Sequence, residues 1–183
     1  VAATLAFSTI ANNDKVGLIF FSDKIEKYIP AQKGKTHVLH IIRELLSFEP
    51  NSKGTDMAQA LQYFANAQKR HCTAFLISDF IGAGAVDKPL LIASNRHEVN
   101  AIQIYDRREA ELPNIGLVKF HDAESDKDLW IDTSLTTVRD DYAQAWKQNQ
   151  DSLEQLFTRT GVNHISVRTD EDYVKALMHL FRC

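Results

Sequence analysis

Residues 73–80 read TAFLISDF, a short apolar run that ends at an aspartate. No charged residue interrupts the run before Asp79, and polar residues flank it on both sides. This pattern is typical of a strand buried on both faces of a parallel sheet. Ligands of open parallel sheets bind just beyond the carboxyl ends of the strands. Asp79, followed by Gly82 and Gly84, therefore marks the first place to expect a small ligand.

The composition indicates an ordinary globular protein. The chain has 183 residues, of which 44% are hydrophobic and 25% charged, enough for one domain with a real core. Its net charge of -3 gives no basic field for nucleic acid or an anionic membrane, so neither is an expected partner of this piece. The only cysteines are Cys72 and Cys183. Because Cys72 adjoins the buried run, we expect a packed free thiol and a cytoplasmic location.

Periodicity along the chain predicts alternating strands and helices. Helical patterns cover residues 1–11, 36–48, 56–68, 86–94, 135–160 and the C-terminal end, and strand patterns cover 16–21, 25–29, 73–79, 98–105, 117–121, 128–131 and 163–167. Pro30 is expected to end the second strand, residues 106–113 to form a loop, and Thr169 to cap the last helix. The alternation predicts a single α/β domain over residues 1–183, a three-layer sandwich with a mainly parallel sheet and an added hairpin at about 117–131.

Thr55 and Asp79 form the main candidate site. Thr55 lies in the polar loop of residues 52–56. If strands 16–21 and 73–79 lie close in the sheet, this loop and Asp79 reach the same rim. A hydroxyl and a carboxylate there suit Mg²⁺, which prefers oxygen ligands. Spacing alone favours a plainer explanation, in which Thr55 or Asp56 caps a helix and Asp79 forms a turn.

Four segments in order carry a resemblance to a known family. They are VGLIFFSDKIEKYIPAQKGKTHVLHIIREL (16–45), SKGTDMAQAL (52–61), TAFLISDF (73–80) and HEVNAIQIYDRREAELPNIG (97–116), joined by D-A-E at 122–124 and R-x-x-Y at 139–142. The chain resembles the von Willebrand factor A-type (Rossmann-like) domain of the domain of unknown function fifty-eight family. That bacterial family is allied to MoxR-type AAA+ ATPases.

The resemblance implies a metal-ion-dependent adhesion site. Thr55 matches the threonine of such sites, Asp79 matches their last aspartate, and Ser52, Gly54 and Asp56 would contact the partner. The D-x-S-x-S motif that supplies the other ligands does not occur in this sequence. The family pattern puts it upstream of Val1, so we read the chain as a piece truncated before its first, central strand. Mg²⁺ is expected in the intact parent and is expected to bind this piece weakly or not at all.

Loss of the central strand would leave two rows of backbone donors and acceptors without partners, each costing about 1–3 kcal/mol if buried. We therefore expect either that the sheet closes up or that a second chain covers the exposed sheet edge, as in a homodimer.

The leading functional hypothesis is a protein-interaction module and not an enzyme. A partner carboxylate would complete the Mg²⁺ shell, and the resemblance implies a MoxR-type AAA+ ATPase system as the setting. The alternative is a metal-dependent hydrolase or phosphotransferase that uses Asp79 at the strand tip. No second carboxylate motif or evident nucleophile supports this alternative.

Other motifs favour plain structural roles. Gly82 and Gly84 lack the third glycine of a dinucleotide fingerprint. The alternating acids at 122–128 lack the glycine of a calcium loop. His37 and His40 lie one helical turn apart without a third ligand and are expected on the solvated surface. His71 beside Cys72 has no positioned acid, so a thiol nucleophile is not expected.

Overall fold

A computed structural model of the protein describes residues 1–52, 54–82, 84–122 and 127–180. The chain divides into two compact units, which are described one at a time. Unit 1 comprises Val1–Arg70 and Gly82–Ala93, and unit 2 comprises His71–Ile81 and Ser94–Cys183. The expectation of a single domain stays a prediction.

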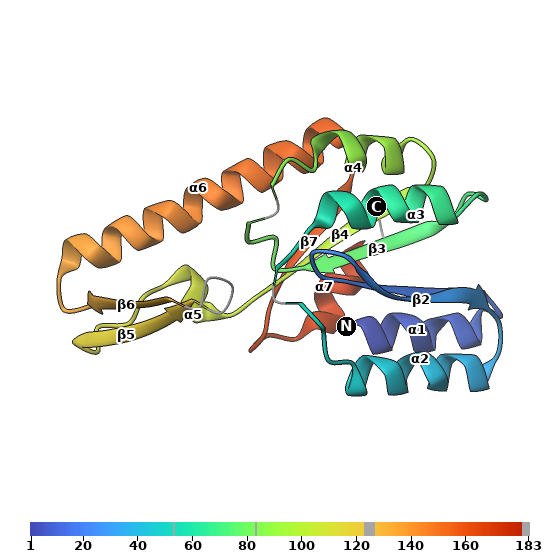
Figure 1. Cartoon of the computed structure of the whole chain (residues 1–183), viewed down its shortest axis with the longest axis horizontal. Coiled ribbons are helices and arrows are strands. Elements are labelled where there is room, and N and C mark those ends of the chain that lie inside the picture. The colour runs from blue at the N-terminus through green and yellow to red at the C-terminus, as the bar shows by residue number, and fades with distance from the viewer. Residues whose placement is uncertain (53, 83, 123–126, 181–183) are drawn as a thin grey trace. The chain divides into compact units, whose positions relative to one another are not determined.

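The elements follow the predicted periodicity closely (Figure 1). The helices are α1 (Ala2–Ala11), α2 (Lys35–Ser47), α3 (Met57–Ala67), α4 (Asp87–Ser94), α5 (Arg107–Ala110), α6 (Thr136–Thr160) and α7 (Tyr173–Leu180). The strands are β1 (Val16–Phe21), β2 (Ile25–Gln32), β3 (Thr73–Ser78), β4 (Glu98–Tyr105), β5 (Leu117–Asp122), β6 (Lys127–Asp132) and β7 (Asn163–Arg168).

Unit 1 is built around the antiparallel hairpin of β1 and β2. Helices α1 and α2 lie side by side on one face of the hairpin and α3 on the other (Figure 1). Because strand side chains alternate between faces, Ile29 joins the core beneath α1 and α2, which also contains Ala6, Val38 and Ile41. Its neighbour Tyr28 instead meets Tyr63 of α3 edge to face at 5.7 Å.

The prediction that Pro30 ends the second strand is wrong, since β2 continues to Gln32. An edge strand tolerates proline because an outward-facing N–H is not needed by the ladder. The register also shifts between Val16 and Leu18, opposite Gln32 and Ile29.

Gly17 lies within that register shift, and a side chain there would collide with β2. A Cβ atom at Gly17 would lie 2.8 Å from the Ile29 carbonyl oxygen and 2.9 Å from the Ala31 nitrogen. Since backbone atoms cannot move aside cheaply, we expect Gly17→Ala to lower the free energy of unfolding by about 1–3 kcal/mol. Urea unfolding measures this change. Gly54→Ala is the matched control, because its methyl group would meet Asp23 at an ordinary 3.5 Å, and equal losses in both variants would contradict the prediction.

Unit 2 contains a parallel three-stranded sheet in the order β3-β4-β7. The middle strand β4 is buried over five successive residues, Val99 to Gln103, as expected for a strand with neighbours on both edges. Helices α6 and α7 contact β7, and α5 contacts α6. The protein is therefore a mixed α/β structure with a short parallel sheet, as its alternating pattern predicted.

One predicted loop needs a correction, and the described strands form separate sheets. Within the described residues β1 and β2 make one two-stranded sheet, and β3, β4 and β7 make a three-stranded one. That the sheet closes up stays a prediction. The predicted loop at 106–113 contains the short helix α5. The predicted hairpin forms from β5 and β6, although residues 123–126 lie outside the described part. A homodimer through an exposed sheet edge stays a prediction.

Candidate functional site

The loop that carries Thr55 is tied to the turn at the carboxyl end of β1. The Asp56 amide donates to the Ser22 carbonyl at 2.7 Å. The Glu26 carboxylate accepts from the Asn51 amide at 3.1 Å and from its side chain at 2.7 Å. The buried Ser22 hydroxyl donates to the same carboxylate at 2.7 Å. The bonds from the Asn51 side chain and then from Ser22 hold the pKa of Glu26 below its usual value. Glu26 thus anchors the Thr55 loop, a role that sequence analysis did not predict.

The four predicted residues of this loop differ in their availability for a ligand. Thr55 is exposed and its hydroxyl is not engaged by another described residue. Asp56, and not Thr55, is the N-cap of α3, because its Oδ1 accepts from the Gln59 amide at 2.9 Å. Ser52 and Gly54 are half-buried. Thr55 thus presents an exposed hydroxyl on this loop.

Asp79 directly follows β3, as predicted, and its orientation is fixed locally. Its Oδ1 accepts from the Ile81 amide at 3.0 Å. This Asx-turn fixes the direction in which the carboxylate points. Phe80 between them has φ +59°, a conformation that costs L-residues about 1–2 kcal/mol. Its ring is 2% exposed and meets Phe157 edge to face at 5.3 Å. Burial of Phe80 therefore holds the strained turn that presents the exposed Asp79 carboxylate.

A row of polar side chains supports the backbone of Asp79 from the neighbouring strands. Ser78, Gln103 and Ser166 stand opposite one another in β3, β4 and β7. The Gln103 side chain donates to the Asp79 carbonyl at 3.3 Å and accepts from the Ser166 hydroxyl at 2.9 Å. Gln103 is 3% exposed, so these bonds satisfy a polar group that would otherwise be buried without partners.

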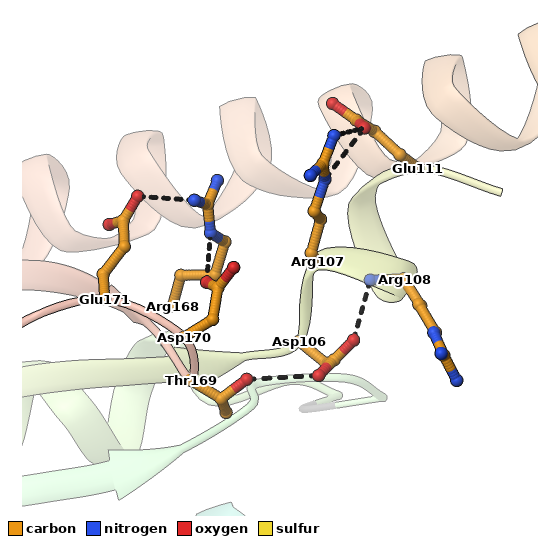
Figure 2. Close-up of polar contacts among 8 residues, drawn as sticks. All are labelled: Asp106, Arg107, Arg108, Glu111, Arg168, Thr169, Asp170 and Glu171. Atoms are coloured by element: carbon orange, nitrogen blue, oxygen red, sulfur yellow. Dashed lines mark hydrogen bonds and ion pairs between the residues drawn. The ribbon is translucent and has the colours of Figure 1, made fainter. Parts of the chain in front are cut away.

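Asp106 and Thr169 join the carboxyl ends of β4 and β7 (Figure 2). The Thr169 hydroxyl donates to Asp106 Oδ2 at 3.1 Å, and the Arg108 amide donates to Oδ1 at 2.8 Å. The prediction that Thr169 caps the last helix is therefore wrong, and the Asp172 carboxylate accepts from the Val174 amide there instead. Like Asp79, Asp106 and Thr169 directly follow strands, a signal that sequence analysis used only for Asp79.

The arginines of this edge differ in their partners (Figure 2). Arg107 pairs with Glu111 at 3.2 Å. Arg168 pairs with Asp170 and with Glu171. These pairs lie at the surface, where such contacts contribute little to stability. The Asp106–Thr169 bond instead adds to the backbone bond at the same strand ends, in which the Thr169 amide donates to the Tyr105 carbonyl at 3.0 Å.

Removal of the Thr169 hydroxyl is expected to raise the pKa of Asp106. The backbone bond from Arg108 and then the bond from Thr169 hold that pKa below its usual value. A carboxyl with a lowered pKa stabilises the folded state above its ordinary pKa, and this contribution is lost as pH falls through the lowered value. Thr169→Val should therefore move the Asp106 titration toward the ordinary range, measured by NMR of the carboxyl carbon. The Asp132 titration is the internal control, and an unmoved Asp106 curve would contradict the assignment.

Thr55 lies on the loop that is bonded to the turn after β1, and Asp79 directly follows β3, but the two residues belong to unit 1 and unit 2 respectively. Their meeting at one rim stays a prediction. Within the described residues, no three His, Cys, Asp or Glu side chains gather as a metal-binding group.

The histidine expectation is only half right. His40 is exposed, 3.8 Å from Glu44, whereas His37 is half-buried and its Nε2 lies 2.8 Å from the Val16 carbonyl oxygen. The alternating acids considered as a calcium loop lie partly outside the described residues, at Glu124 and Asp126.

This geometry defines the class of protein: a mixed α/β fold with polar side chains at the ends of its strands. Residues 1–152 match the family described as protein of unknown function DUF58, and the chain belongs to that family. It is 30% identical over 158 residues to an uncharacterized protein of Mycobacterium avium, covering 84% of this chain and 92% of the relative. It is also 30% identical over 177 residues to an uncharacterized protein of Mycobacterium tuberculosis, covering 94% of this chain. The chain spans 55% of that relative's length.

Two solved structures share the fold. One is the conserved hypothetical protein BatB of Bacteroides thetaiotaomicron, with a TM-score of 0.55 over 99% of this chain and 85% of that one. The other is an aerotolerance-related membrane protein of Bacteroides fragilis, with a TM-score of 0.58 over 100% of this chain and 87% of that one. Both are 16% identical to this chain, so the likeness concerns the fold alone. In the described part of this chain, every helix is too short or too polar to cross a bilayer.

Proposed function

We propose that the protein is a protein-interaction module with a von Willebrand factor A-like fold, and that its full-length form binds a partner carboxylate through Mg²⁺. Thr55 and Asp79 would each supply an oxygen ligand, and the other ligands would come from the D-x-S-x-S motif that the family resemblance puts upstream. Ser52, Gly54 and Asp56 would lie next to the bound partner. The expected setting is a cytoplasmic MoxR-type AAA+ ATPase system.

One observation carries this proposal: Asp79 is an exposed carboxylate held at the tip of β3 by a strained turn in which Phe80 is buried. Backbone strain of this kind is often kept where it orients a functional group. Thr55 supports the proposal in the same way, since its hydroxyl is exposed on a loop anchored to the end of β1. Membership of the DUF58 family agrees with it without assigning a function.

The alternative, a metal-dependent hydrolase or phosphotransferase using Asp79, would need the same ion. The two functions are separated by titrating Mg²⁺ into the full-length protein and screening the loaded protein against phosphoester substrates. We expect saturable binding without turnover. Turnover that Asp79→Ala abolishes would instead establish the enzyme, and absence of Mg²⁺ binding would refute both.

A further inference from the structure

Two side chains that bind borderline transition metals meet at the amino end of the parallel sheet in unit 2, the end opposite to Asp79. Cys72 directly precedes β3 and His97 directly precedes β4. The Glu98 amide donates to the Cys72 carbonyl at 3.0 Å, which fixes the two strand starts side by side. Cys72 Sγ lies 3.6 Å from His97 Nδ1.

This separation suits two ligands of one tetrahedral ion. Zinc binds sulfur at about 2.3 Å and imidazole nitrogen at about 2.0–2.1 Å, which at a tetrahedral angle sets the two atoms about 3.5 Å apart. His97 is 3% exposed, so packing holds its ring beside the Cys72 thiol.

His71, which directly precedes Cys72, is the third ligand that the site would recruit on binding, because the described side chains as they lie bring no three metal-binding groups together. It is exposed, and its ring centroid lies 6.4 Å from that of His97. Only Cys72 and His97 are at coordination distance as the side chains lie, so His71 must rotate to reach a shared ion. An exposed side chain next to the strand start can make this rotation, since rotamers of exposed residues interchange within picoseconds to nanoseconds.

We propose that Cys72 Sγ, His97 Nδ1 and His71 bind a borderline transition-metal ion of the Zn²⁺ class, with a water molecule in the fourth position. Thiolate and imidazole select such ions over Mg²⁺. The sulfur binds the metal as a thiolate, so binding forms the metal–sulfur bond and releases the thiol proton to solvent. This site is separate from the Mg²⁺ site proposed above and does not depend on it.

Co²⁺ titration into the reduced full chain at neutral pH tests this site directly. A thiolate ligand gives Co²⁺ a charge-transfer band in the near ultraviolet, and we expect that band to saturate at one equivalent and to bleach when Zn²⁺ is added. Cys72→Ser should abolish the band. Cys183→Ser is the matched control, because it removes the only other cysteine and should leave the band unchanged.

The two histidines are tested by competition with Zn²⁺. Loss of an outer-shell partner alone costs a zinc site about 10–100-fold in affinity, so loss of the ligand in His97→Gln should cost at least about 100-fold. Because His97 is buried, circular dichroism must show that this variant folds. His71→Asn alters an exposed side chain and should weaken binding about tenfold. The proposal fails if the wild-type chain gives no thiolate band, if Cys72→Ser keeps it, or if His71→Asn binds as tightly as wild type.

Discussion

Phe80→Ala is expected to lower the free energy of unfolding by about 3–5 kcal/mol, the usual cost of removing a buried phenylalanine ring. The ring is 2% exposed and packs against Phe157, so truncation leaves a cavity in unit 2. Urea unfolding followed by circular dichroism measures the loss. Phe7→Ala is the control, because Phe7 is 48% exposed and its loss should cost less than about 1 kcal/mol.

A second substitution separates packing from backbone strain at the same position. Since Phe80 has φ +59°, alanine there keeps the strain whereas glycine relieves it. Phe80→Gly should therefore be more stable than Phe80→Ala by about 1 kcal/mol, although glycine is smaller. A glycine variant less stable than the alanine variant would show that the turn is not strained.

Asp79→Asn is expected to weaken Mn²⁺ binding by the full-length protein at least about 100-fold, equivalent to about 2.7 kcal/mol. Asparagine keeps an oxygen that can accept from the Ile81 amide, so the turn should persist and stability should change little. Only the charged ligand is lost. Isothermal titration measures the affinity, and Thr55→Val should reduce it about tenfold.

Asp140→Ala serves as the control for this series. It removes one exposed carboxylate from α6 and changes the net charge by the same amount, yet it should bind Mn²⁺ as wild type does. If Asp140→Ala and Asp79→Asn weakened binding equally, the effect would be one of net charge and Asp79 would not be a ligand.

Local patterns predicted most of the secondary structure because periodicity reports which side of an element is buried. The TAFLISDF run gave a strand at Thr73–Ser78 with Asp79 at its tip. The prediction that Pro30 ends its strand was wrong because the proline lies at an edge of the hairpin, where a missing N–H breaks no ladder bond. The sequence alone does not show which strand edges are left unpaired.

The contacts that position the candidate site, namely the Asp106–Thr169 bond and the turn at Phe80, could not be predicted from local patterns. Thr169 and Asp106 are 63 residues apart, and a Thr followed by acidic residues has the local pattern of a helix cap. The hydrogen bond to Asp106 prevails because β4 and β7 are neighbours. The strained turn at Phe80 was also missed, since no local signal predicts a left-handed phenylalanine that burial of its own ring stabilises.

The central claim is that Thr55 and Asp79 hold one ion, and paramagnetic broadening tests it most directly. Mn²⁺ added at substoichiometric amounts to the isotope-labelled full-length protein broadens amide signals close to the bound ion. We predict that the amides of Thr55 and Asp79 broaden together, with the same dependence on Mn²⁺ concentration, and recover together when excess Mg²⁺ is added. Broadening at only one of the two residues, or at neither, would contradict the shared site.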